Sequence, residues 1–108
     1  MIDYSFREVR KKDGSRKLLI TFADEQYDLV AEFLQEEDLT GLQKKVLQVL
    51  ETEKDSTHKG KKFRMALFPA YTVVYDDSDD FRWCQINTED LYDVLDDWHK
   101  HTEEMQKH

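Results

Sequence analysis

Apolar side chains alternate with polar ones over residues 2–6 and again over residues 18–22. Alternation with a period of two is typical of a strand that buries one face. The polar segment KKDGSRK lies between the two runs, and its Asp13-Gly14 pair supplies the glycine that a tight hairpin turn needs for a positive φ. The pattern therefore predicts a β-hairpin that turns at Asp13-Gly14.

Helical spacing, in which apolar residues recur every three or four positions, first appears after Asp24. Positions 27, 30, 31 and 34 are apolar and share one face, and Asp24 is a suitable N-cap for the segment. Phe33 lies off this stripe. The sequence leaves two interpretations for Phe33, which either widens the core face of the helix or lies exposed in an interface.

Two more helices are predicted further along the chain. Thr40 and Gln43 have the spacing of a capping box, so we expect a second helix from Thr40 that ends near Lys54. Asn87 or Thr88 is the expected cap of a third helix, whose first turn is acidic as the helix dipole favours. Its apolar positions 91, 94, 95, 98 and 105 form the stripe that we expect to be buried.

Between the second and third helices, β-branched and aromatic residues predict strands over about 62–68, 71–75 and 81–86. Residues 53–62 are polar and contain Gly60, which predicts a loop. Pro69 cannot donate to a strand ladder and should lie at a bend, a bulge or an edge. The order ββααβββα predicts an α+β fold, with an antiparallel sheet of about five strands and helices packed on one face.

The 108 residues fit one globular domain over 1–108, with enough bulky apolar residues for a single core. The first twelve residues lack the apolar run of a secretory signal, and no stretch approaches the length of a membrane span. Cys84 is the one cysteine in the sequence and has no partner for an internal disulfide. We therefore expect a cytoplasmic protein.

The formal net charge of −8 is distributed unevenly. Residues 1–75 carry thirteen acidic and thirteen basic residues, whereas residues 76–108 carry eleven acidic residues against Arg82, Lys100 and Lys107. The whole negative excess therefore lies in the last third of the chain.

The densest acidic segment is DDSDD, at residues 76–80. An EF-hand loop that began at Asp76 would need glycine at its sixth position and glutamate at its twelfth, but Phe81 and Asn87 stand there. Two aspartates about 6 Å apart in water repel each other by roughly 0.7 kcal/mol, so four of them do not favour folding. A solvated turn, a looser cation site and a binding surface remain as interpretations of this segment.

Helical geometry extends the acidic pattern to the third helix, because its acidic residues point away from the apolar stripe. If the turn lies beside that helix, the two form one acidic patch that can steer and hold a basic partner. The predicted partner-binding residues are Asp76, Asp77, Asp79, Asp80, Glu89, Asp93, Asp96 and Asp97.

Other candidate chemistry in the sequence is weaker. His99 and His101 are two residues apart, so they do not share a helix face, and His99 with Glu103 is too small a set for a metal. Cys84 has no nearby histidine in the sequence and fits a buried, unreactive cysteine, although His58 is not excluded as a partner. Phosphate-binding loops and nucleophile motifs are also missing, so we predict no enzyme activity, no metal and no cofactor.

Basic residues gather in two stretches, at residues 7–17 of the hairpin and residues 58–64. With aromatic residues nearby, these stretches support an alternative function as a small RNA- or DNA-binding domain. The net charge of −8 opposes nonspecific binding to nucleic acid.

In its size, single-domain form and acidity, the chain resembles the small immunity or inhibitor proteins that neutralise nuclease toxins. In such proteins Asp and Glu side chains take the place of phosphates. The resemblance implies a non-enzymatic, acidic protein-binding module whose partner is a basic protein, such as a toxin or nuclease. A DNA mimic that blocks a DNA-handling protein is a related alternative.

Overall fold

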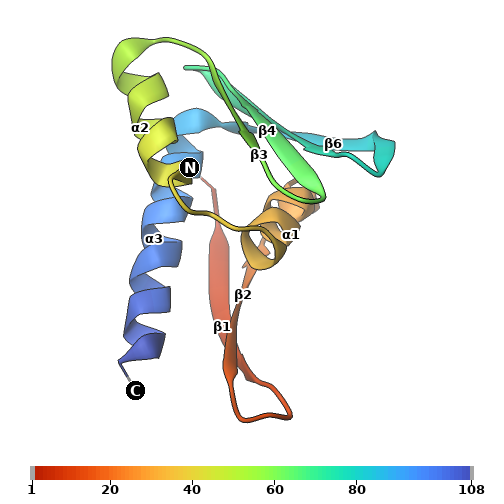
Figure 1. Cartoon of the computed structure of the whole chain (residues 1–108), viewed down its shortest axis with the longest axis vertical. Coiled ribbons are helices and arrows are strands. Elements are labelled where there is room, and N and C mark those ends of the chain that lie inside the picture. Colours follow the sequence, from red (N-terminus) through yellow and green to blue (C-terminus); the bar gives the residue numbers. More distant parts are fainter. Residues whose placement is uncertain (1, 108) are drawn as a thin grey trace.

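A computed structural model describes residues 2–107, which form three α-helices, one short 3-10 helix and six strands (Figure 1). In chain order the elements are β1 (Tyr4–Arg10), β2 (Arg16–Phe22), the 3-10 helix η1 (Glu25–Tyr27), α1 (Asp28–Glu36), α2 (Leu42–Thr52), β3 (Ser56–Lys59), β4 (Phe63–Leu67), β5 (Tyr71–Asp76), β6 (Asp79–Asn87) and α3 (Thr88–Gln106).

The strands form two antiparallel sheets, one of two strands and one of four. β1 pairs with β2 along its whole length to make a two-stranded ribbon, and β3, β4, β5 and β6 form a meander in that order. The predicted α+β class is confirmed, but two sheets replace the single sheet of about five strands. The ribbon remains separate because α1 lies between it and the larger sheet, in contact with β2, β5 and β6 (Figure 1).

β3 corrects the predicted loop over residues 53–62. Ser56–Lys59 pairs with β4, and His58 is the single buried side chain of this four-residue strand. The His58 ring packs 5.9 Å from the Phe33 ring, and its Nε2 lies 3.2 Å from the carbonyl oxygen of Asp38. A strand with one buried position has no apolar periodicity, so no pattern in the sequence predicts it.

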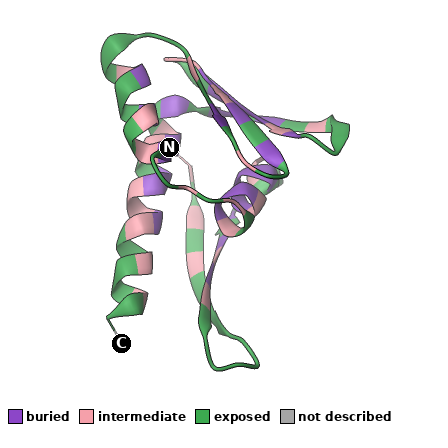
Figure 2. Ribbon diagram, viewed as in Figure 1, coloured by how far each residue is buried: buried purple, intermediate pink, exposed green. Residues whose placement is uncertain are grey.

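One face of the larger sheet supplies much of the core. Phe63, Met65 and Leu67 of β4 point into it, together with Val74 of β5 and Ile86 of β6. All three helices contact this sheet, and their buried side chains join the ribbon and the sheet in one apolar cluster. Figure 2 marks buried positions in purple on the helices and on the strands of the larger sheet. Each large apolar side chain buried in this way stabilises the fold by roughly 1.5–3 kcal/mol.

The hairpin predicted at Asp13-Gly14 is confirmed. Arg10 pairs with Arg16 at the end of the ladder, and Gly14 has a φ of +87° in the turn. The Asp13 carboxylate accepts hydrogen bonds from the Ser15 backbone N–H and hydroxyl, at 2.9 Å and 2.6 Å. The glycine is therefore required here by a backbone conformation that other residues rarely adopt.

Two of the predicted helix caps are found, although one of them caps a different element. Asn87 accepts from the backbone N–H groups of Glu89 and Asp90 at the start of α3, as expected. Asp24 accepts from the Gln26 backbone N–H, but the element that it caps is η1, and α1 begins four residues later at Asp28.

The capping box predicted at Thr40 and Gln43 is wrong. The Thr40 hydroxyl and backbone N–H both donate to the Asp38 carboxylate, at 2.7 Å and 2.9 Å, so Thr40 does not cap the helix. Gly41 takes the N-cap position with a φ of +78°, and α2 begins at Leu42. The competing local turn at Asp38 removes the hydroxyl that a capping box requires.

Phe33 widens the core face of α1, because its side chain is fully buried and packs against the ring of Phe63. We expect Phe33→Ala to lower the free energy of unfolding by about 3–5 kcal/mol, since it removes apolar contact and leaves a cavity. Urea unfolding measures this change. Leu47→Ala is the matched control, because Leu47 on α2 is 39% exposed and its loss should cost less than about 1 kcal/mol. Equal losses in the two variants would contradict the packing described here.

Candidate functional site

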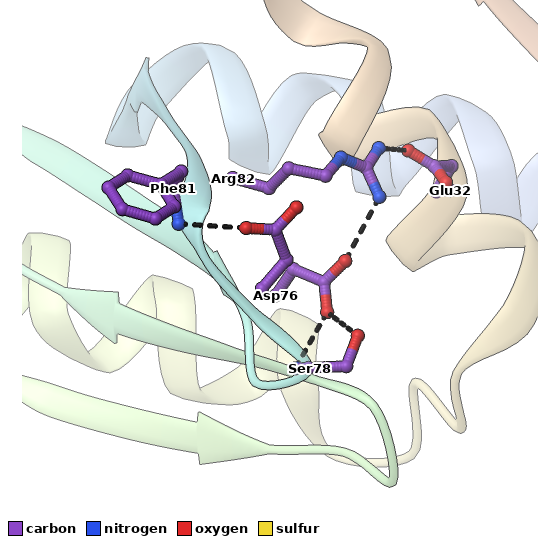
Figure 3. A network of polar contacts seen from close by, with 6 residues as sticks. Glu32, Asp76, Ser78, Phe81 and Arg82 are labelled. Atoms are coloured by element: carbon purple, nitrogen blue, oxygen red, sulfur yellow. Dashed lines mark hydrogen bonds and ion pairs between the residues drawn. The ribbon is translucent and has the colours of Figure 1, made fainter.

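The DDSDD turn joins β5 to β6, and its first aspartate is part of the interior. Asp76 is only 4% exposed. One oxygen of its carboxylate accepts from the Ser78 hydroxyl at 2.6 Å and from the Ser78 backbone N–H at 2.9 Å, and the other accepts from Arg82 at 3.0 Å (Figure 3). The Ser78 hydroxyl bond is the main cause that lowers the pKa of the Asp76 carboxyl. The negative charge of Asp76 is thus balanced inside the protein by Arg82.

Arg82 connects this turn to α1. Its guanidinium forms ion pairs with Asp76 and with Glu32 of α1, which approaches from the opposite side (Figure 3). The hydrogen bond to Glu32 is the main cause that raises the pKa of Arg82, and Asp76 adds to it. A register shift between Tyr75 and Asp76 accompanies this contact at the end of the β5–β6 ladder.

The other three aspartates of the turn lie at the surface. Asp77 pairs with Arg64 at 2.9 Å, and Asp79 accepts a hydrogen bond from the backbone N–H of Phe81 at 3.0 Å. Within residues 2–107, no Lys or Arg side chain forms a salt bridge with Asp79 or Asp80. Asp79 and Asp80 are therefore the two carboxylates of the turn that remain available to a partner.

The acidic residues of α3 gather on one side of the helix. We call this set, with two acidic residues of the last turns added, the acidic ridge; it consists of Glu89, Asp93, Asp96, Asp97, Glu103 and Glu104. At 100° per residue these six positions fall within an arc of about 120°, opposite the buried stripe of Leu91, Val94, Leu95 and Trp98. Lys100 is the one Lys or Arg of α3, and the C-cap residue Lys107 falls within the same arc.

Two members of the acidic ridge have contacts within the protein. Asp96 pairs with Lys100 at 2.9 Å and accepts from Gln43 of α2 at 3.3 Å, and these bonds lower the pKa of its carboxyl. Asp97 accepts a hydrogen bond from the Tyr4 hydroxyl of β1. Burial, and after it this contact with Asp97, raise the pKa of Tyr4. The other four members of the ridge are exposed.

The structure does not bring the turn and the acidic ridge together. The turn lies at the start of β6, whereas α3 begins where β6 ends (Figure 1). A strand of nine residues separates them by roughly 26 Å at about 3.3 Å per residue. The eight predicted partner-binding residues therefore form two separate acidic areas, with Asp76 removed from the surface, and not one continuous patch.

The two basic stretches are also apart. Residues 7–16 of the ribbon are all exposed and extend away from the core, whereas residues 58–64 lie at the hairpin between β3 and β4 (Figure 1, Figure 2). Within the second stretch, His58 is buried and Arg64 is paired with Asp77. Within residues 2–107 the two stretches therefore do not form a single phosphate-binding surface.

Cys84 and His101 of α3 both have packing contacts within the protein. Cys84 is buried on the core face of β6, and burial raises the pKa of its thiol to about 11. The His101 ring stacks on Phe6 with ring centres 4.1 Å apart, and its Nδ1 lies 2.9 Å from the Asp97 carbonyl oxygen. In the part of the chain from 2 to 107, no three His, Cys, Asp or Glu side chains are placed to hold a metal ion together.

Comparisons with protein-family models, with curated proteins and with solved structures find no match for this chain. Of the helices formed by residues 2–107, none combines the length and the apolar character that crossing a membrane requires. The class that the structure defines is a small α+β domain.

The sequence reasoning missed one surface, the outer face of the larger sheet. Tyr71, Val73 and Tyr75 occupy the alternate positions of β5 that lie on this face, where Tyr71 and Tyr75 are at least partly exposed and Val73 is buried, and Trp83 lies opposite Tyr75 on β6. These aromatic residues do not belong to the core face of the sheet. The signal was present in the sequence as two alternating patterns, but aromatic residues in strands are usually assigned to the core.

Asp76→Asn tests the internal role of the first aspartate. The native fold favours the ionised carboxylate, so its stabilising effect is complete above the ordinary pKa of 3.8 and is lost as the pH falls through the lowered native value. We therefore expect Asp76→Asn to be clearly less stable than the parent near neutral pH, and the difference to shrink well below pH 3.8. Urea unfolding at both pH values measures it, with the exposed Asp80→Asn as control. A difference that stays constant at acid pH would contradict this role.

The burial of Cys84 predicts slow reaction with thiol reagents. Because the thiolate is the reactive form, a thiol with a pKa of about 11 should react far more slowly in the folded protein than in urea at mildly alkaline pH. Ellman's reagent measures both rates, and Cys84→Ser gives the background. Equal rates in the folded and unfolded protein would show that the thiol is accessible.

Proposed function

We propose that this protein is a non-enzymatic binding protein of the immunity or inhibitor class, which holds a basic protein partner against the acidic ridge of α3. The observation that carries the proposal is the arc of six carboxylates with one lysine among them, on the longest helix of the protein. Residues 89–104 span roughly 22 Å along the helix axis at 1.5 Å per residue. The ridge is long enough to face several cations of a partner.

The cost of these charges to the helix supports a role in recognition. Glu89 and Asp93 are four residues apart, and like charges at that spacing destabilise a helix by a few tenths of a kcal/mol. Glu103 and Glu104 lie near the C-terminal end of α3, where the helix dipole disfavours negative charge. The helix dipole favours Glu89 in the first turn, but the requirements of the helix do not account for Asp93, Glu103 and Glu104, whereas the binding of a basic partner does.

The rigid base of the ridge supports the same function. Leu91, Val94, Leu95 and Trp98 hold α3 in the core, and the contacts of Asp96 and Asp97 fix the middle of the ridge. Carboxylates on a rigid helix lose little conformational entropy when a partner binds. A basic site that normally holds nucleic acid fits this surface best, since its cations already face a row of negative charges. A DNA mimic would use the same surface.

Neutralising the ridge should remove binding. We expect the wild-type protein, immobilised at low salt, to capture a basic protein from a lysate of its source cells and to release it as salt rises, because exposed charges are screened. The variant Glu89→Gln/Asp93→Asn/Glu103→Gln/Glu104→Gln should retain at most about a tenth of that protein. Mass spectrometry of the eluate makes the comparison.

Asp79→Asn/Asp80→Asn is the matched control for this experiment, because it removes exposed carboxylates at the far end of β6. It should capture the partner as the wild type does. Equal capture by the ridge variant, or capture that does not change with salt, would contradict the proposal.

A second candidate, nucleic-acid binding, is favoured by one observation. The exposed part of the ribbon carries Arg7, Arg10, Lys11, Lys12 and Arg16 against Glu8 and Asp13. A two-stranded ribbon has dimensions that fit the major groove of DNA. If the immobilised protein captures nucleic acid, and nuclease treatment of the lysate abolishes all capture, this candidate replaces the first.

A further inference from the structure

The outer face of the larger sheet carries a set of apolar side chains that are partly or fully exposed, except for the buried Val73. We call this set the aromatic face; it consists of Ala66, Tyr71, Val73, Tyr75, Phe81 and Trp83, and Arg64 and Gln85 lie on the same side of the sheet. Tyr71 is 40% exposed, Trp83 58% and Phe81 94%. The Phe81 ring points away from Arg82 and α1 (Figure 3). Large aromatic side chains that gather on an exposed sheet face are typical of a surface that another molecule covers.

Opposite charges flank this face at one end of the sheet. The β3–β4 and β5–β6 hairpins both turn at that end, where the Asp77 backbone N–H donates to the Lys62 carbonyl oxygen at 2.9 Å. Lys59 and Lys61 stand on the β3 side, and Asp79 and Asp80 stand on the β6 side. The two pairs are separated by three strand spacings, roughly 14 Å.

We infer that the aromatic face binds the same face of a second copy of this chain. Two sheets that pack face to face keep their strands within about 30° of each other. A two-fold axis that runs parallel to the strands, between the two faces, places β6 of one copy over β3 of the other. Asp79 and Asp80 of each copy then face Lys59 and Lys61 of its partner, and the aromatic residues lie between the two charged rows.

Charge also argues against single-stranded nucleic acid as the occupant. Bases stack well on exposed aromatic rings, but such sites carry a positive groove for the backbone. Here Arg64 is already paired with Asp77 and stacked on Tyr75, at 4.8 Å from the ring centre. Lys59, Lys61 and Lys62 of the β3–β4 hairpin are balanced by Asp79, Asp80 and Glu37, whose carboxylate accepts from the Lys61 and Lys62 backbone N–H groups. A face with rows of both signs fits a copy of itself better than it fits a polyanion.

The size of the face sets the expected strength. Four strands at about 4.8 Å and about five residues at 3.3 Å give a flat footprint of roughly 320 Å². Specific interfaces usually bury about 800 Å² of accessible surface per partner. The footprint of this face remains smaller than that even when the extra surface of protruding side chains is added. The dimer should therefore be weak and reversible. The inference does not rest on the proposed function, because the acidic ridge belongs to α3 on the other side of the sheet.

A charge exchange tests the inference sharply. Sedimentation equilibrium of the wild-type protein should show a mass that rises from monomer toward dimer with concentration. Asp79→Lys/Asp80→Lys and Lys59→Glu/Lys61→Glu should each weaken self-association by about tenfold or more, because each places like charges opposite each other. In an equimolar mixture of the two variants both charged rows become complementary again, so a heterodimer should form at least as readily as the wild-type dimer.

Recovery in the mixture also shows that both variants are folded, which is the control for their loss of association alone. A wild-type protein that stays monomeric at every concentration would overturn the inference, and so would variants that associate as the wild type does. A mixture that remains monomeric would overturn it as well. Binding of oligouridylate by monomeric wild-type protein, lost in Trp83→Ala, would assign the face to nucleic acid instead.

Discussion

The Arg82 guanidinium joins three parts of the protein that hydrophobic packing alone would not hold in register. It reaches Asp76 at the end of β5 and Glu32 on α1, while its own backbone belongs to β6. Apolar contacts are non-directional, so they hold α1 between the two sheets without determining its exact position relative to the strands. An ion pair that spans the helix and the end of the ladder supplies that direction, and a buried Asp76 without Arg82 would be an uncompensated charge.

This contact explains why a tight turn carries so many like charges. Asp76 is turned inward by Ser78 and Arg82, Asp77 is paired with Arg64, and Asp79 satisfies a backbone N–H. Three aspartates therefore have local structural partners, which reduces the repulsion expected from their sequence spacing. The acidity of the turn is in large part a matter of folding. That of α3 is not, because within residues 2–107 three of its ridge carboxylates, Asp93, Glu103 and Glu104, form no salt bridge and lie outside the first turn, where the helix dipole favours a carboxylate.

Local signals in the sequence were reliable where one residue decides the conformation. The turn at Gly14 was predicted correctly, and so was a cap at Asn87 or Thr88, which the structure assigns to Asn87, because a positive φ and an N-cap hydrogen bond depend on nearest neighbours. The apolar stripe of α3 was equally visible. The capping box predicted at Thr40 was wrong because the Thr40 hydroxyl donates to the carboxylate of Asp38, two residues earlier. β3 and the division into two sheets depend on distant contacts, such as His58 with Phe33, that no local pattern contains. The separation of the acidic areas depends likewise on the length and direction of β6.

The position of β6 also limits how a second copy can approach. β6 is an edge strand of the larger sheet, and such edges readily pair with strands of other molecules. Here the edge begins with Asp79 and Asp80, its ladder is irregular at Tyr75 and Asp76, and Arg82 turns its charge inward toward α1. Charged residues, irregular ladders and inward-pointing charges all oppose edge pairing. On the aromatic face the charge of Arg64 is paired with Asp77 and its guanidinium is stacked on Tyr75, so association of two copies is directed to the face of the sheet and away from its edge.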